Sequence, residues 1–203
     1  MSFVALRVHA KEIAVRVVDR KYEDPFWLAR FGARGRVRSE EDIAYHVDYL
    51  AQAIEADDAG ILERYALWLR GVLTSRGMCT LHLDESFAQL EVSLPDDIRS
   101  VAASYIQKAR SALRHENGPA GEIDRAASSI VRAFVESAPA NVERRVLASA
   151  VAHRLSYLAD ALAENRAVGE ADPTLDVALT SRVDEAAASL SLAVRESLSA
   201  LPS

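Results

Sequence analysis

The chain has 203 residues, of which 50% are apolar, so it can bury a sizeable hydrophobic core without covalent cross-links. Its single cysteine, Cys79, excludes an internal disulfide framework and is typical of a reducing compartment. A net charge of −6 argues against a dedicated nucleic-acid-binding protein. Charged residues begin near Met1, and no uncharged run approaches the roughly 20 residues that span a bilayer. We therefore expect a soluble, cytoplasmic protein with neither a nucleic acid nor a membrane as partner.

The composition predicts an all-α protein. Alanine is abundant, and glycine and proline stand mainly between segments in which apolar residues recur at helical spacing. In chain order, the expected helices span residues 3–21, 25–31, 39–56, 61–77, about 80–93, 95–115, 120–138, 140–166 and 174–200.

Two of these helices carry clear start signals. Asp24 followed by Pro25 is typical of an N-cap and the first helical residue. Ser39, three residues before Asp42, resembles a capping box and predicts a helix start at Ser39. Gly32 falls between the two, where the sequence predicts the end of the 25–31 helix.

The helix predicted from Ser39 has two different faces. Its core side is an apolar stripe, and beside it lies a stripe of titratable and aromatic residues at helical spacing. The apolar stripe consists of Ile43, Val47, Leu50 and Ile54, and the second stripe of Asp42, Tyr45, His46 and Tyr49.

The second stripe has two interpretations. A carboxylate can accept hydrogen bonds from ring N–H groups, and aromatic rings pack on flat molecules, which indicates a ligand such as a tetrapyrrole. Alternatively, Asp42 stabilises the first turn of the helix. In that case Tyr45, His46 and Tyr49 pack at a helix–helix contact with their polar tips at its edge.

The stretch from Asp42 to Gly77 resembles the E and F helices of phycobiliproteins and of their globin-like relatives. The matching residues are Asp42, Tyr49, Ala53, Ala56, Asp58, Ala59, Leu62, Glu63, Leu69, Arg70 and Gly77, in a register without gaps. The resemblance implies that Asp42 hydrogen-bonds the pyrrole nitrogens of a bilin. The stretch is also similar to the helical bundle of cobalamin photoreceptors and to stress-sensor globins without haem.

Two departures from the phycobiliprotein pattern bear on function. Ser39 stands where that family attaches its chromophore through cysteine, so the usual thioether is impossible. Glu41 replaces the arginine beside the aspartate. We therefore expect a protein without a light-harvesting role, similar to globins associated with bilin biosynthesis.

Four arginines in a short segment form an anion site if they converge, or else a solvated loop between helices. They are Arg30, Arg34, Arg36 and Arg38. Under the tetrapyrrole interpretation, Arg34, Arg36 and Arg38 bind propionates, Trp68 is a wall of the site, and His46 is the axial ligand if the pigment is haem or cobalamin.

No catalytic or metal-binding motif stands out. The five histidines show neither H-x-x-x-H nor E-x-x-H spacing, and one cysteine among scattered histidines does not indicate a zinc site. We therefore expect neither an enzyme nor a metal site.

The resulting expectation is an all-α, globin-like or phycobiliprotein-like bundle with extra C-terminal helices. Residues 1–138 form the core, and residues 139–203 form a helix pair, packed on the core or separate from it. The expected function is non-covalent binding of a bilin by a homodimer, for sensing, carriage or protection of the pigment, with haem or cobalamin as other ligands. The alternative is a ligand-free interaction or stress-sensor module that acts through helix–helix dimerisation.

Overall fold

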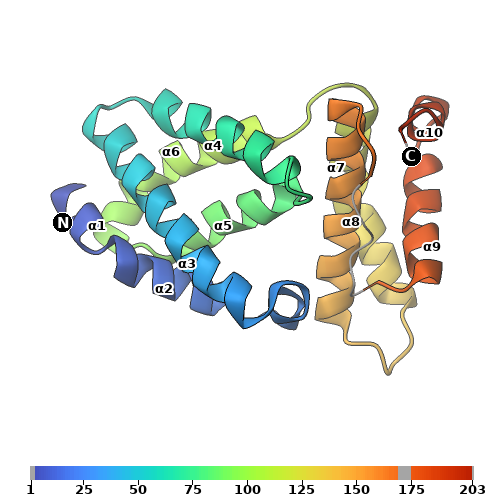
Figure 1. Ribbon diagram of the computed structural model, residues 1–203, viewed down its shortest axis with the longest axis horizontal. Coiled ribbons are helices and arrows are strands. Elements are labelled where there is room, and N and C mark those ends of the chain that lie inside the picture. The colour runs from blue at the N-terminus through green and yellow to red at the C-terminus, as the bar shows by residue number, and fades with distance from the viewer. Residues whose placement is uncertain (1–2, 169–174, 203) are drawn as a thin grey trace. The chain divides into compact units, whose positions relative to one another are not determined.

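The computed structural model describes residues 3–168 and 175–202, and within them the chain forms ten helices and no strand (Figure 1). This confirms the all-α prediction. The helices are α1 (Phe3–Val8), α2 (Ala10–Lys21), α3 (Pro25–Glu55), α4 (Ala59–Thr74), α5 (Thr80–Ser93), α6 (Asp96–Leu113), α7 (Gly118–Ser137), α8 (Arg144–Glu164), α9 (Val177–Ala188) and α10 (Leu192–Ser199). In the described part of the chain, no helix is both long enough and apolar enough to cross a bilayer.

The helices belong to two compact units. Unit 1 comprises Met1–Val72 and His82–Leu113, and unit 2 comprises Leu73–Leu81 and Arg114–Ser203. The boundary expected between residues 138 and 139 therefore falls inside unit 2. The physical reason is that α7 and α8 share one core, in which Ile123 packs in the same cluster as Val151 and Leu155.

Each unit has its own hydrophobic core. In unit 1 the apolar stripe expected on α3 is buried: Ile43 is 1% exposed, and Val47 and Leu50 are fully buried. Phe26 and Phe87 fill the same interior. In unit 2 the core is formed by α7, α8, α9 and α10, with Val183 and Val194 both fully buried.

The helix expected over residues 3–21 is interrupted. Its chain leaves helical geometry at His9, so that α1 ends at Val8 and α2 begins at Ala10. The prediction of one continuous helix was therefore wrong at this point, although its buried residues Ile13 and Val17 lie where the apolar spacing placed them.

The largest difference from expectation lies in α3. Asp24 caps its start, because the Oδ1 atom accepts a hydrogen bond from the backbone N–H of Phe26 at 3.0 Å. Gly32 then has φ 61° and ψ −170°, a conformation that essentially only glycine adopts, and it kinks the helix. Helical geometry resumes directly after Gly32. The predicted helix start at Ser39 was therefore wrong, and Ser39 and Asp42 both lie inside a helix.

The segment expected as one helix over 174–200 is two helices. Residue 174 lies outside the described residues. Between α9 and α10, the hydroxyl of Ser191 accepts a hydrogen bond from the backbone N–H of Val194 at 3.2 Å and so caps α10. The hydroxyl provides a start signal that the periodicity of leucine and valine does not show.

Substitution of Gly32 tests the kink. Gly32→Ala places a Cβ on a backbone with φ 61°, and we expect it to lower the free energy of unfolding by about 1–3 kcal/mol, because of backbone strain and not of a clash. Gly71→Ala in α4 is the matched control, because a Cβ there also meets open space but the backbone is helical. It should raise stability by up to about 1 kcal/mol. Urea denaturation of both variants checks this, and equal effects would contradict the assigned conformation.

Candidate functional site

The continuous helix after Gly32 places a line of polar and aromatic residues along one side of α3. Arg34, Arg38, Asp42, Tyr45 and Tyr49 follow one another at spacings of three or four residues, which puts them on one stripe. Because Asp42 lies well inside the helix, it cannot stabilise a first turn. The capping interpretation of Asp42 is thereby removed.

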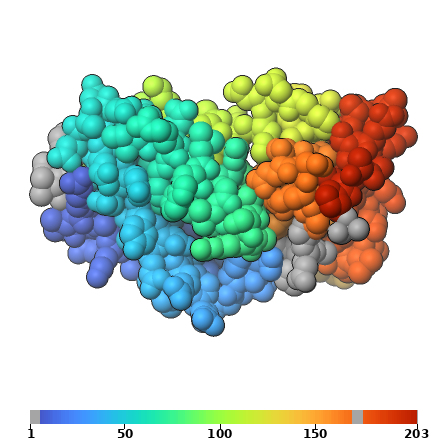
Figure 2. Space-filling model, turned by 45° about the horizontal axis from the view of Figure 1, so that its top comes forward, coloured from blue at the N-terminus to red at the C-terminus, as the bar shows by residue number. Residues whose placement is uncertain are grey.

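Aromatic residues of α3 and α4 gather in unit 1, two of them exposed and Tyr65 buried at 6% exposure. We call Tyr45, Tyr49, Tyr65 and Trp68 the aromatic face. The rings of Tyr49 and Tyr65 are stacked with centroids 3.9 Å apart, and the Tyr65 and Trp68 centroids are 6.1 Å apart. Tyr45 is 63% exposed and Trp68 is 62% exposed. The two helices contribute to the outer surface of unit 1 in the space-filling view (Figure 2).

Such exposure of large aromatic side chains points to a binding surface. Tyr and Trp carry large apolar areas whose contact with water is unfavourable, so they are usually covered or functional when they gather at a surface. Asp42 lies near these rings: after burial, its negative charge is the next largest cause that raises the pKa of Tyr65. The aromatic face thus combines flat stacking surfaces with one nearby carboxylate.

His46 lies beneath this face and not on it. It is only 3% exposed, its Nδ1 is 2.8 Å from the hydroxyl oxygen of Tyr65, and its ring stacks on Phe87 at 5.1 Å. Burial, and next the positive charge of Lys21, lower the pKa of His46 to about 3. The imidazole is therefore neutral at physiological pH, and it positions Tyr65 from below.

A buried lysine occupies the interior of unit 1. The Nζ atom of Lys21 donates a hydrogen bond to the hydroxyl of Ser86 at 2.6 Å and lies 3.8 Å from the centroid of the Trp27 ring. Burial lowers the pKa of Lys21 to about 8, against the opposing effect of the carboxylates of Glu85 and Asp42. Burial likewise raises the pKa of Glu85 to about 7.

Lys21 was not among the site residues predicted from the sequence. A usable signal exists, because Lys21 follows Val17 by four residues and so continues the apolar stripe of α2. A charged residue on a buried stripe is usually hydrogen-bonded or shifted in pKa, and Lys21 is both.

The three arginines expected to bind propionates do not converge. Arg36 forms an ion pair with Asp19 of α2 and lies over the ring of Tyr22 at 5.3 Å. Arg38 contacts Glu41 at 3.3 Å on the surface, a pair that contributes little to stability. Arg34 and Arg38 lie in line with the aromatic face, whereas the side chain of Arg36 is directed towards α2.

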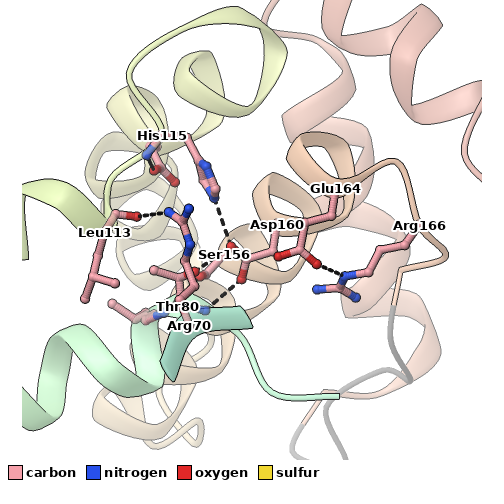
Figure 3. A network of polar contacts seen from close by, with 10 residues as sticks. Arg70, Thr80, Leu113, His115, Ser156, Asp160, Glu164 and Arg166 are labelled. Atoms are coloured by element: carbon pink, nitrogen blue, oxygen red, sulfur yellow. Dashed lines mark hydrogen bonds and ion pairs between the residues drawn. The ribbon is translucent and has the colours of Figure 1, made fainter. Parts of the chain in front are cut away.

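Unit 2 contains a buried polar network that the sequence analysis also missed (Figure 3). The carboxylate of Asp160, on α8, is fully buried. It accepts hydrogen bonds from the backbone N–H and the hydroxyl of Thr80 at 2.7 and 2.6 Å, and it lies 2.9 Å from Nε2 of His115. Thr80 and His115 are distant from Asp160 in the chain, so no local sequence motif predicts these contacts. One weak signal is the charge of Asp160 within an otherwise apolar stretch of α8.

The chain was also compared with known proteins. No family model, curated protein or solved structure matches it. Its function must therefore be argued from its own residues.

Replacement of His46 gives a pH-dependent result. Because the folded pKa of about 3 lies below the ordinary 6.5, the unfolded chain binds a proton that the folded chain does not at intermediate pH. Wild-type stability should therefore fall relative to His46→Gln as the pH drops below 6.5, with a slope approaching about 1.4 kcal/mol per pH unit. Denaturation of both proteins across pH 7 to about 4 measures this. A difference that does not change with pH would contradict a buried, neutral imidazole.

Asp160→Asn should destabilise unit 2 by about 2–4 kcal/mol. The amide puts an N–H donor where the carboxylate accepts hydrogen bonds, so buried donors of Thr80 or His115 lose their acceptor. The control is Glu196→Gln, an exposed carboxylate of the same unit, which should change stability by no more than about 0.5 kcal/mol. Urea denaturation followed by circular dichroism makes the comparison. An effect of Asp160→Asn no larger than that of the control would show that the network contributes nothing.

Proposed function

We propose that unit 1 binds a bilin-type tetrapyrrole on the aromatic face, without a covalent bond, for sensing, carriage or protection of the pigment. One observation carries this proposal. Tyr45 on α3 and Trp68 on α4 are 63% and 62% exposed, and the Trp68 ring lies 6.1 Å from that of Tyr65, which is 6% exposed and stacks on Tyr49. A flat conjugated molecule is the class of ligand that stacks on such a surface.

The polar residues along α3 suit the edges of the same ligand. Asp42 lies one turn before Tyr45, where its carboxylate can accept hydrogen bonds from pyrrole N–H groups. Arg34 and Arg38 continue the stripe, and their guanidinium groups suit the propionates of a tetrapyrrole. Arg36 has no part in this binding mode, because its side chain is directed towards Asp19 and Tyr22 and away from the stripe.

A bilin suits this site better than haem or cobalamin. An axial ligand would have to be His46, whose ring is buried between Phe87 and Tyr65 and bonded to the Tyr65 hydroxyl. Coordination of a metal would require that ring to leave its position. A metal-free pigment needs no axial ligand, so His46 can stay in its buried position.

We also propose that the first half of the chain is related to the globin-like family of phycobiliproteins. It rests on the residues from Asp42 to Gly77, which lie on α3, α4 and the turn that follows. Gly77 has φ 76°, a backbone conformation that favours glycine. This conformation explains why a glycine stands at the last matching position of the Asp42–Gly77 segment. Under this proposal, the end of α3 and the whole of α4 are the counterparts of the E and F helices of that family.

The second candidate function is association of two copies through the same face. Its supporting observation is the exposure of two large aromatic side chains, Tyr45 at 63% and Trp68 at 62%, which a second copy could cover. Aromatic residues of this kind are enriched at protein interfaces. The two functions differ in what covers Trp68: a bound pigment in the first, and a second copy of the chain in the other.

The test is titration of the purified chain with biliverdin, haem and cobalamin, followed by the absorbance of each pigment. We expect saturable binding of biliverdin. Tyr45→Ala and Trp68→Ala should each weaken it by about 10-fold, as expected for loss of one stacking ring. Asp42→Asn should shift the pigment spectrum, because the variant loses the charge next to the pyrrole nitrogens.

Leu28→Ala is the matched control, because Leu28 is 57% exposed on the first part of α3, before the kink, and outside the aromatic face. It should leave binding unchanged. Absence of a saturable change with any of the three pigments would overturn the proposal. Sedimentation that shows a dimer dissociated by Trp68→Ala would then favour the second candidate.

A further inference from the structure

Unit 2 contains a cavity that has no part in the function proposed for unit 1. Residues of α8, α9, α10 and the chain after α8 line it, and its volume is about 320 Å³. A water molecule takes about 30 Å³ of the liquid, so the cavity has room for roughly ten non-hydrogen atoms. This volume lies at the lower end of the range typical of small-molecule sites in proteins.

Part of the lining is apolar. Leu158 of α8 is 2% exposed and belongs to the hydrophobic core of unit 2. Val168 and Leu198 pack against that core and also line the cavity, together with Ala188 of α9. The cavity therefore continues the core outwards, and it suits a ligand with a small apolar group.

One charged side chain of the lining is held by a buried partner. The guanidinium of Arg154, on α8, donates hydrogen bonds from Nε and Nη2 to the two carboxylate oxygens of Asp184 at 2.8 and 2.6 Å. Arg154 is only 7% exposed. Bidentate pairs of this kind fix the geometry of both partners. The charge of Asp184 is thereby neutralised, and its side chain is a fixed part of the cavity wall.

Two further charged residues of the lining have opposite signs. Glu185 lies in the last turn of α9 and Arg195 lies on α10, and both are exposed. Neither side chain forms an ion pair with another residue of the described part of the chain. The carbonyl groups at the C-terminal end of α9 add partial negative charge near Glu185, which favours a cation there. The cavity thus offers one position for a cation and one for an anion.

We propose that this cavity binds a free α-amino acid with an aliphatic side chain, for which leucine is the probe. The carboxylate of the ligand pairs with Arg195 and its ammonium with Glu185, through charge-assisted hydrogen bonds. Its side chain lies against Leu158, Val168 and Leu198. Leucine is of about the size that the cavity admits. All the residues involved belong to unit 2, so the site does not depend on the function proposed for unit 1.

The experiment follows the ¹H–¹⁵N spectrum of the full chain during addition of leucine, up to about 10 mM because so small a ligand binds weakly. We expect saturable shifts of the backbone amide signals of Ala188 and Ser199, which line the cavity. Three analogues separate the contributions: 4-methylpentanoate lacks the ammonium, 3-methylbutylamine lacks the carboxylate, and glycine lacks the side chain. The first two should bind at least about 10-fold more weakly than leucine, and glycine should show no saturable binding.

Variants assign the contacts. Arg195→Gln and Glu185→Gln each remove one charge and should weaken leucine binding by about 10-fold. The matched controls are Arg182→Gln on α9 and Glu196→Gln on α10, which remove the same charges from exposed positions outside the lining and should bind leucine as the wild type does. Ala188→Phe fills the cavity without a change of charge and should abolish binding. Circular dichroism checks that each variant is folded.

Three outcomes would overturn the site. The first is a wild-type chain whose amide signals show no saturable change with leucine. The second is leucine binding that Arg195→Gln and Glu185→Gln leave at the wild-type level. The third is glycine binding as tight as that of leucine, because the apolar wall would then have no part in recognition.

Discussion

The aromatic face depends on one backbone constraint, the position of the kink in α3. Because Gly32 absorbs the change of direction by itself, the helix that follows is long enough to carry a complete stripe from Arg34 to Tyr49. Ile43 and Val47 must remain in the core, and this fixes the rotation of the helix about its own axis. The direction in which the stripe points is thereby fixed as well. The outward direction of position 45 is therefore a consequence of core packing, and the proposed function accounts for the aromatic side chain at that exposed position.

The position of the Gly77–Leu81 segment within unit 2 has a different origin. There, Tyr157 and Asp160 of α8 form hydrogen bonds with the segment that contains Cys79. Buried hydrogen bonds of this kind contribute modestly when they are formed and cost much when one partner is lost. They therefore specify where the segment lies relative to α8 more strongly than they stabilise the unit.

Local patterns in the sequence predicted the helices well and the sites less well. The Asp24–Pro25 start and the buried stripe of Ile43 and its neighbours follow from local rules, and both were confirmed. The start at Ser39 was wrong, because a capping pattern does not reveal that a helix already begins after Gly32. The approach of Thr80 and Asp160 depends on contacts between distant segments, which spacing along the chain cannot show.

The two tryptophans allow the central claim, that the aromatic face binds a flat pigment, to be tested within one protein. Trp68 is 62% exposed on that face, whereas Trp27 is 5% exposed in the interior, so each indole N–H reports on a different environment. In a ¹H–¹⁵N spectrum recorded during addition of biliverdin, the Trp68 indole signal should move or broaden in a saturable way, while the Trp27 signal stays in place. Unchanged signals from both indoles, or equal changes at both, would contradict the account.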